Sequence, residues 1–190
     1  QGNIMYPKSE PYKLCTFSRV MKEKGIEDAA NAVRSVNAHF GRTVYTLDIF
    51  GQVDAGYEER FSELKKSFPS YISYGGTIEA NKSVEILKSY FALLFPTYYK
   101  GEGFAGTLID AMSAGVPVIA SDWKYNSEFV VPGKTGVIIE NCNAERLAEE
   151  LINIAAAPEK WNSMRLSSLK ESEKYKPDIA ARPLIDRING

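Results

Sequence analysis

The segment of this sequence best equipped for chemistry is a glycine-rich loop flanked by two carboxylates. Glu102 stands in the loop TYYKGEG, and Asp110 follows in a stretch of helical pattern that begins near Phe104. Where such a loop enters a helix, the first backbone N–H groups have no partner within the helix, and the helix dipole adds partial positive charge. An anion such as a phosphate is the guest that this junction favours.

Two cations in an earlier loop would complement an anion at that junction. The loop FSRVMKEKG carries Arg19 and Lys24, and Gly25 provides a turn before the next helical segment. A guanidinium donates hydrogen bonds in a fork and an ammonium adds a compact charge, so the pair suits a diphosphate. Taken alone, the two side chains fit solvated surface charges better. The glycine-rich loop, expected at the same end of the sheet, shifts the balance toward a binding role.

The second carboxylate, Asp110, is spaced to share a helix face with Gly106 and Ala114. It therefore faces the same side as the first helical turn, where it could accept two hydrogen bonds from a ribose diol. The alternatives stay open at this point: Asp110 as a solvated helix acid, and Glu102 as a loop acid only.

Hydrophobic periodicity predicts strands and helices in regular alternation. The expected strands are 13–17, 43–50, 71–74, 91–95, 116–120 and 136–139. The expected helices are 26–40, 57–68, 83–90, 104–115, 127–131, 144–156, 158–175 and 178–188. This order predicts an α/β fold, a Rossmann-like doubly wound parallel sheet of about six strands with helices on both faces. Ligands of such sheets bind at the carboxyl ends of the strands, where the loops 17–25, 74–83 and 97–103 should meet.

Composition narrows the class of protein. The chain has 190 residues, 44% of them hydrophobic, which is enough for one domain with a sizeable core. A net charge of −1 excludes a strongly basic nucleic-acid-binding protein, and no apolar run approaches the length of a transmembrane helix. The two cysteines lie far apart and outside any metal-ligand spacing, so we expect reduced thiols in a cytoplasmic protein without a metal site.

Three segments carry a resemblance to a known family: FSRVMKEKG, GEGFAGTLIDAMSAGVPVIASD and VVPGKTGVIIE. They resemble the G-R-x-x-x-x-K-G loop, the E-G-F-G-x-x-x-x-E-A-M-A-x-G-x-P-V-V-A-S-D signature and the I-V-x-x-G-x-T-G-x-L-V segment of retaining glycosyltransferases of the GT-B fold, family four. The similarity runs from about residue 12 to residue 156. It matches the C-terminal, donor-binding half of a fold that has two Rossmann-like domains.

The resemblance implies a domain organisation. Residues 1–190 would form one nucleotide-sugar-binding domain, with 1–11 as a lead-in and 158–190 as C-terminal helices. The N-terminal acceptor-binding domain is absent from this chain, which begins with Gln1 rather than Met. We therefore expect a fragment that transfers no sugar by itself.

The resemblance also implies roles for individual residues. Arg19 and Lys24 would hold the donor diphosphate, and Glu102 would contact hydroxyls of the donor sugar; these three form the expected catalytic set. Thr77 and Ile78 would line the pocket for the base. The remaining donor-binding positions would be Gly103, Phe104, Ala105, Gly106 and Thr107 around the helix start, and Asp110 at the ribose.

Three departures from the family pattern bear on the donor. Asp110 is one methylene shorter than the usual Glu, so its contact with the ribose is expected to be longer or bridged by water. Ala105 replaces a glycine and narrows the approach. The stretch WKYNSE, residues 123–128, replaces one that is often rich in glycine, GGIPE. The outer wall of the donor pocket is expected to differ accordingly.

The chemistry that the resemblance implies is transfer of a sugar, with retention, from a UDP-, GDP- or ADP-sugar to a saccharide or lipid-linked acceptor. No cofactor, metal or nucleic acid is expected, and the setting would be polysaccharide or glycoconjugate biosynthesis. The full-length protein would be cytoplasmic, with peripheral contact to the inner membrane face as an option. A non-catalytic nucleotide-sugar-binding module and a GT-B-fold epimerase or phosphorylase stay open as alternatives.

Overall fold

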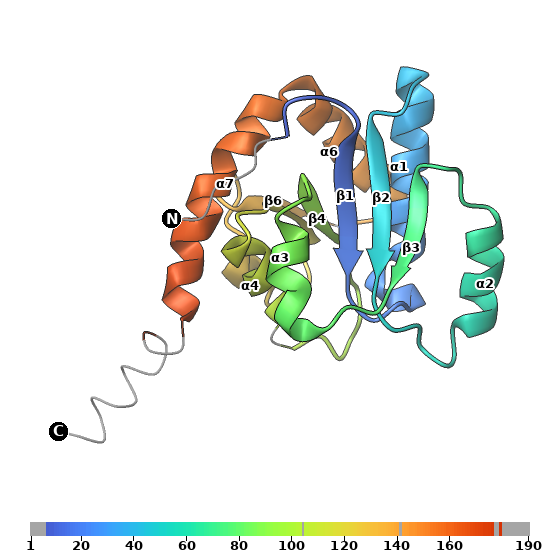
Figure 1. The fold of residues 1–190 in the computed structure, drawn as a ribbon, viewed down its shortest axis with the longest axis horizontal. Coiled ribbons are helices and arrows are strands. Elements are labelled where there is room, and N and C mark those ends of the chain that lie inside the picture. Colours follow the sequence, from blue (N-terminus) through green and yellow to red (C-terminus); the bar gives the residue numbers. More distant parts are fainter. Residues whose placement is uncertain (1–6, 104, 141, 177–178, 180–190) are drawn as a thin grey trace.

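A parallel sheet of six strands forms the centre of the chain (Figure 1). The strands are β1 (Tyr12–Phe17), β2 (Tyr45–Phe50), β3 (Ile72–Gly76), β4 (Ala92–Phe95), β5 (Val118–Ser121) and β6 (Gly136–Ile139). Their order is β3-β2-β1-β4-β5-β6, and every neighbouring pair is parallel. The structure is a computed structural model that describes residues 7–103, 105–140, 142–176 and 179.

Helices cover both faces of this sheet. They are α1 (Ile26–Phe40), α2 (Glu58–Lys66), α3 (Ser83–Leu87), α4 (Gly106–Ser113), α5 (Asn126–Phe129), α6 (Ala144–Ala156) and α7 (Pro158–Ser172), with short 3₁₀ turns η1 (Lys22–Lys24), η2 (Ala80–Lys82) and η3 (Glu173–Tyr175). Helices α1, α2 and α6 contribute to one hydrophobic core, and α3, α4 and α5 to the other. The predicted Rossmann-like α/β fold is confirmed.

The predicted boundaries of the helices agree best with the structure where the amphipathic periodicity of the sequence is strong. Helices α1 and α6 and strand β6 begin and end at the predicted residues. Helix α3 stops at Leu87 rather than Tyr90, because Ser89 and Tyr90 donate to carbonyls three residues back and tighten the chain into a turn before β4. The helix predicted at 178–188 lies almost wholly outside the described residues.

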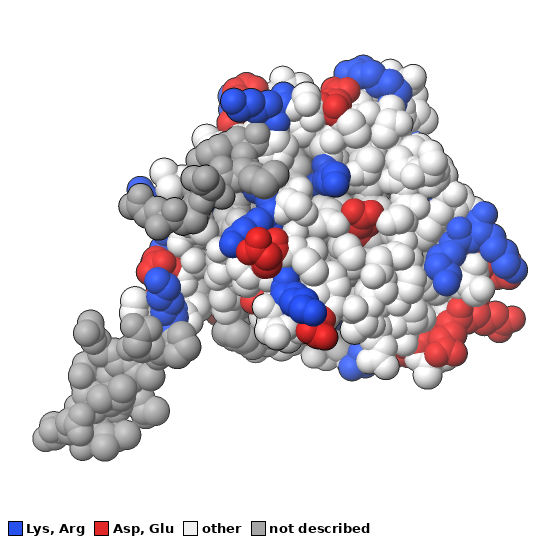
Figure 2. Space-filling model, in the orientation of Figure 1, with Lys and Arg blue, Asp and Glu red and all other residues white. Residues whose placement is uncertain are grey.

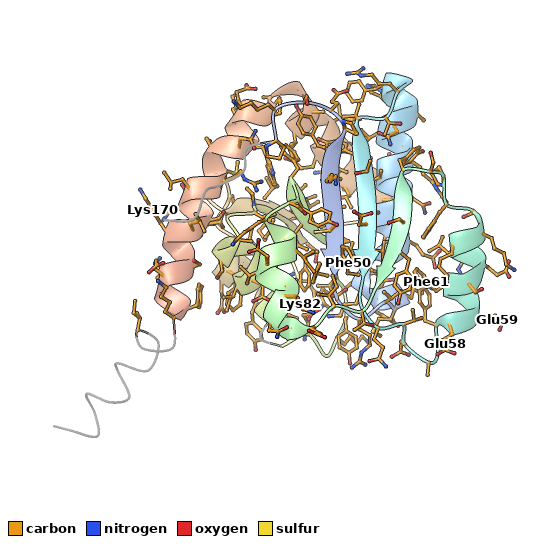
Figure 3. The ribbon with its side chains drawn as sticks, in the orientation of Figure 1. Phe50, Glu58, Glu59, Phe61, Lys82 and Lys170 are labelled. Atoms are coloured by element: carbon orange, nitrogen blue, oxygen red, sulfur yellow. The ribbon has the colours of Figure 1, made fainter. Side chains whose placement is uncertain are left out.

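Helix α2 shows how one apolar stripe is enough to fix a short helix on the sheet. Phe61 is 1% exposed and packs edge-on against the Tyr74 ring of β3, with 5.1 Å between the ring centroids, whereas Glu58 and Glu59 lie on the solvent side (Figure 3).

Charges of both signs are scattered over the face of the molecule in Figure 2. Among the described residues, no helix is both long and apolar enough to cross a membrane.

One buried polar side chain joins the end of α1 to the beginning of β2. Asn37 is 5% exposed, and its Oδ1 accepts hydrogen bonds from the backbone N–H groups of Val44 at 2.9 Å and Tyr45 at 3.0 Å. Its Nδ2 donates to the carbonyl of Tyr45 at 2.8 Å. This side chain therefore satisfies three backbone groups and fixes where the chain turns from the helix into the sheet.

Asn37→Ala should lower the free energy of unfolding by about 2–4 kcal/mol, because three hydrogen bonds are lost and buried backbone groups are left without partners. Urea denaturation followed by circular dichroism measures the change. The matched control is Asn31→Ala on the exposed side of the same helix, which should stay within about 0.5 kcal/mol of the unchanged protein. Equal effects of the two substitutions would contradict the assignment.

Candidate functional site

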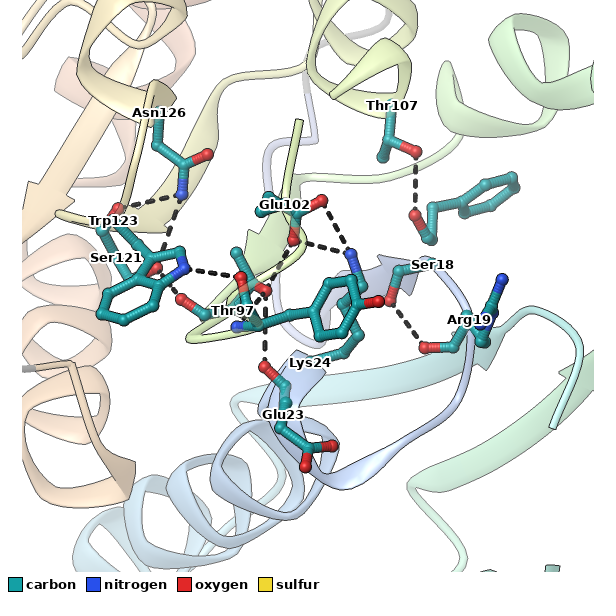
Figure 4. Close-up of polar contacts among 12 residues, drawn as sticks. Ser18, Arg19, Glu23, Lys24, Thr97, Glu102, Thr107, Ser121, Trp123 and Asn126 are labelled. Carbon is teal, nitrogen blue, oxygen red and sulfur yellow. Dashed lines mark hydrogen bonds and ion pairs between the residues drawn. The ribbon is translucent and has the colours of Figure 1, made fainter. Parts of the chain in front are cut away.

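The loops that carry the predicted catalytic residues lie side by side because β1 and β4 are neighbours in the sheet. Cys15 pairs with Leu93, so the two strands end at the same edge. The loops that follow enclose a hollow of about 280 Å³, which we call the central hollow (Figure 4). Its lining includes Arg19, Lys24, Glu102, Ala105, Gly106 and Thr107. Six of the residues predicted for the site thus line one cavity.

An ion pair between Lys24 and Glu102 forms the floor of this hollow. Lys24 Nζ lies 2.6 Å from Oε2 and 2.8 Å from Oε1 of Glu102, and the Thr97 hydroxyl donates to Oε2 at 2.7 Å. The two charged side chains are only 11% and 9% exposed. The ammonium also lies 5.6 Å from the ring centroid of Phe95 and 5.2 Å from that of Tyr99. The pair is therefore largely removed from water and held in one geometry.

Gly25 makes the approach of the two loops possible. It adopts a φ of +69°, which favours glycine, and it both ends η1 and caps the start of α1. A Cβ at this position would lie 2.3 Å from the carbonyl oxygen of Pro96, just after β4. Only a residue without a side chain lets the β1 loop pass this close to β4, and this contact places Lys24 beside Glu102.

The second predicted cation lies at the rim of the hollow rather than on its floor. The Arg19 side chain is 60% exposed, and its guanidinium is 3.5 Å from a carboxylate oxygen of Asp54. An exposed pair of this length contributes little to stability. Arg19 is therefore free to exchange Asp54 for another anion at the mouth of the hollow.

The start of α4 forms the opposite wall. Its N-cap residue, Ala105, has no side chain that could accept from the first turn, and a Cβ on Gly106 would meet nothing within 4 Å. The first N–H groups of the helix are thus approachable from the hollow. Thr107 is tied down, since its hydroxyl donates to the Phe17 carbonyl at 2.9 Å. Gly103 is exposed in the preceding loop, and Phe104 lies outside the described residues.

Asp110, Thr77 and Ile78 line a separate cavity of about 230 Å³, which we call the Asp110 hollow. It shares Ser18 and Thr107 with the central hollow, so the two cavities adjoin. The Ser83 hydroxyl donates to Oδ2 of Asp110 at 2.6 Å. The structure therefore divides nine of the eleven predicted site residues between two neighbouring cavities.

A brace from the end of β5 supports the β4 loop, and the sequence did not predict it. Trp123 Nε1 donates to the Tyr99 carbonyl at 2.7 Å, and the Ser121 hydroxyl donates to the Thr97 carbonyl (Figure 4). Asn126 Nδ2 in turn donates to the Ser121 carbonyl at 3.1 Å. Their position at the end of a buried strand and just after it is the sequence signal that could have indicated them. Among the described residues, no cluster of three or more His, Cys, Asp or Glu could hold a metal ion.

Comparison with known proteins finds similarity to larger proteins. Over 182 residues the chain is 29% identical to the GtfA subunit of the UDP-N-acetylglucosamine–peptide N-acetylglucosaminyltransferase of Streptococcus pneumoniae, covering 94% of the chain and 34% of that protein. The crystal structure of pneumococcal GtfA with UDP and GlcNAc superposes with a TM-score of 0.76 at 24% identity, covering 95% of this chain and 36% of that one. The chain thus spans about a third of the length of these relatives.

A further solved structure matches in size. It is the C-terminal domain of a glycosyl transferase group 1 family protein, LpcC, from Francisella tularensis, with a TM-score of 0.75, 18% identity and 87% coverage of both chains. At this identity the likeness shows the fold alone. The family model "Glycosyl transferases group 1" matches residues 6–168, which is most of the sequence. The chain therefore belongs to the glycosyl transferases group 1 family.

Proposed function

We propose that this chain is the donor-binding domain of a retaining glycosyltransferase and that it corresponds to the C-terminal half of a GT-B fold. The observation that carries the proposal is the buried Lys24–Glu102 pair, which faces the uncapped start of α4 in one hollow. A diphosphate needs positive charge and free N–H groups, and a sugar needs a fixed acceptor for its hydroxyls. The central hollow offers both.

Within this proposal, Lys24 and Glu102 act together on the donor. An ammonium has three N–H donors, so Lys24 can keep its bond to Glu102 and still reach a phosphate oxygen. Thr97 and Lys24 hold the Glu102 carboxylate in a fixed orientation, which suits it to receive a sugar hydroxyl. Arg19 at the rim would add a second cation to the diphosphate.

The proposed chemistry is departure of the nucleoside diphosphate from the anomeric carbon. Negative charge builds on the leaving phosphate, and Arg19, Lys24 and the N–H groups of α4 would stabilise it in a preorganised site. Retention follows if the acceptor attacks from the face that the diphosphate leaves. No residue is assigned as a covalent nucleophile, and independence of a metal and of a cofactor remains a prediction.

The Asp110 hollow would hold the nucleoside. Asp110 would accept from the ribose hydroxyls, Ser83 orients its carboxylate, and Thr77 and Ile78 would contact the base. Asp110 is one methylene shorter than Glu, and the bond from Ser83 fixes one of its two oxygens. UDP is the donor nucleotide that the comparison favours, since the pneumococcal relative was solved with UDP.

The acceptor would be bound by a second domain in a longer protein, because the relatives are about three times the length of this chain. We expect the 190 residues alone to bind UDP and to transfer no sugar, since positioning of the acceptor supplies up to ~7–11 kcal/mol of a barrier. Polysaccharide or glycoconjugate synthesis, a cytoplasmic location and contact with the inner membrane face belong to the same proposal.

Calorimetry with UDP, followed by a transfer assay with UDP-[¹⁴C]glucose, tests whether the chain binds the donor nucleotide without transferring sugar. Sugar transfer by the chain alone would contradict the assignment of acceptor binding to a second domain.

Lys24→Ala should weaken UDP binding by roughly tenfold to a hundredfold, because a charge-assisted hydrogen bond contributes ~1.5–3 kcal/mol. Binding of uridine, which carries no phosphate, should change little. Titration calorimetry with both ligands measures the contrast. The control is Lys100→Ala, which removes an exposed lysine of the same loop cluster outside the hollow. If uridine weakens as much as UDP, the substitution has damaged the fold, and if neither weakens, Lys24 has no part in phosphate binding.

Asp110→Ala should also weaken UDP binding by about tenfold to a hundredfold, for the same energetic reason. Ser83→Ala should have a smaller effect, about threefold to tenfold, since it removes only the hydrogen bond that orients the carboxylate. The discriminating ligand is 2′,3′-dideoxyuridine diphosphate, whose affinity neither substitution should change. An equal loss for UDP and the dideoxy compound would show that Asp110 does not bind the ribose.

A further inference from the structure

A third cavity lies at the same edge, on the face of the sheet opposite the Asp110 hollow. It has a volume of about 530 Å³, within the range of small-molecule sites. We call it the Tyr57 hollow; the residues used here are Lys22, Glu27, Asp28, Tyr57, Arg60 and Tyr98. They come from η1, the start of α1, the start of α2 and the β4 loop. None of these six residues is among the residues predicted to bind the donor.

The Tyr57 hollow lies next to the central hollow, and η1 and the β4 loop contribute residues to both cavities. Lys22 and Lys24 belong to the same turn, η1, and line different cavities. The consecutive residues Tyr98 and Tyr99 are divided in the same way. The backbone N–H of Tyr98 donates to the Glu23 carbonyl at 2.8 Å, and this bond joins the two segments that separate the cavities. A ligand in the Tyr57 hollow would therefore lie directly beside a donor in the central hollow.

The carboxylates of the Tyr57 hollow are held as fixed acceptors. Glu27 receives the Tyr57 hydroxyl at 2.8 Å and Arg60 Nε at 3.0 Å, and a second Arg60 nitrogen completes a fork. The hydrogen bond from Arg60 lowers the pKa of Glu27. Asp28 accepts from the backbone of Ala144, and burial raises the pKa of its carboxyl. Preorganised acceptors of this kind suit hydroxyl groups.

The charge of the cavity selects against ions. Two cations, Lys22 and Arg60, face two carboxylates, Glu27 and Asp28, so the lining is balanced. A phosphate would meet both carboxylates, and a metal cation would meet Arg60 and Lys22. Of the two tyrosines, Tyr98 is 37% exposed and Tyr57 is 7% exposed, so Tyr98 supplies most of the apolar ring surface. A neutral, hydroxyl-rich ligand with apolar C–H faces matches this lining best.

We propose that the Tyr57 hollow is a second saccharide subsite, which takes a neutral sugar unit of the acceptor or product beside the donor. The placement relative to the donor rests on the proposed function, whereas binding of a neutral sugar does not. In the full-length enzyme this subsite would hold the sugar chain against the donor domain while the acceptor domain presents the reacting end.

The test is a titration of the ¹⁵N-labelled chain followed by NMR. The probes are the methyl glycosides of glucose, galactose, mannose and N-acetylglucosamine, with methyl glucuronide as the anionic comparison and UDP in a separate series. We expect at least one neutral glycoside to shift the amides of Lys22, Asp28 and Tyr98, with methyl glucuronide binding more weakly. UDP should shift Lys24 and Gly106 instead.

Substitutions make the assignment specific. Tyr98→Ala should weaken the glycoside about threefold to tenfold through loss of ring contact, and Asp28→Asn about tenfold, while UDP affinity stays unchanged. Tyr125→Ala removes another exposed tyrosine, which lines neither cavity, and should have no effect. The spectrum of each variant reports whether it folds.

The outcomes separate the two proposals. If UDP binds and no neutral glycoside shifts the Tyr57 hollow, the subsite is overturned and the proposed function stands. If a glycoside binds there and UDP does not bind, the donor assignment is overturned and the saccharide site stands. Tighter binding of methyl glucuronide than of the neutral sugars would overturn the charge argument and with it the proposal.

Discussion

The ion pair between Lys24 and Glu102 is the interaction on which the edge of this sheet depends. Two charges that are about nine-tenths buried lose most of their hydration, and attraction offsets this loss only when the geometry is good and the remaining hydrogen bonds are made. Thr97 and the ring of Tyr99 supply those contacts. Loss of either partner would leave the other as an isolated buried charge, which costs about 3–5 kcal/mol. The pair thus fixes the β1 loop against the β4 loop.

The position of the pair follows from the topology of the sheet. The order β3-β2-β1 runs one way from the centre and β4-β5-β6 the other, so the connections diverge between β1 and β4. Loops that leave two such strands turn to opposite faces and open a crevice between them. Lys24 comes from one of these loops and Glu102 from the other. The crevice is therefore a consequence of the fold, and the ion pair joins its two sides.

Sequence reasoning succeeded where a residue's place depends on the chain near it. The periodicity of α1 and α6 is local, and so is the succession of strand, glycine and helix around Glu102. It failed where a partner comes from a distant segment. Neither the bond from Ser83 to Asp110 nor that from Trp123 to Tyr99 has a local pattern, because each joins residues more than 20 positions apart. The pairing of Lys24 with Glu102 was missed for the same reason, although both residues were singled out.

The three hollows described above differ in the charge of their linings. The Asp110 hollow has a single carboxylate beside the rings of Phe17 and Phe50, which suits an uncharged nucleoside with hydroxyls. The central hollow has two cations and one carboxylate, an excess of positive charge that suits a diphosphate.

The Tyr57 hollow is balanced, which suits a neutral sugar. The three hollows adjoin one another in two different ways. Thr107 and Ser18 are common to the first two cavities, while η1 divides the second from the third. A substitution that moves η1 would therefore alter the central hollow and the Tyr57 hollow together, whereas one at Ser83 would act on the Asp110 hollow alone.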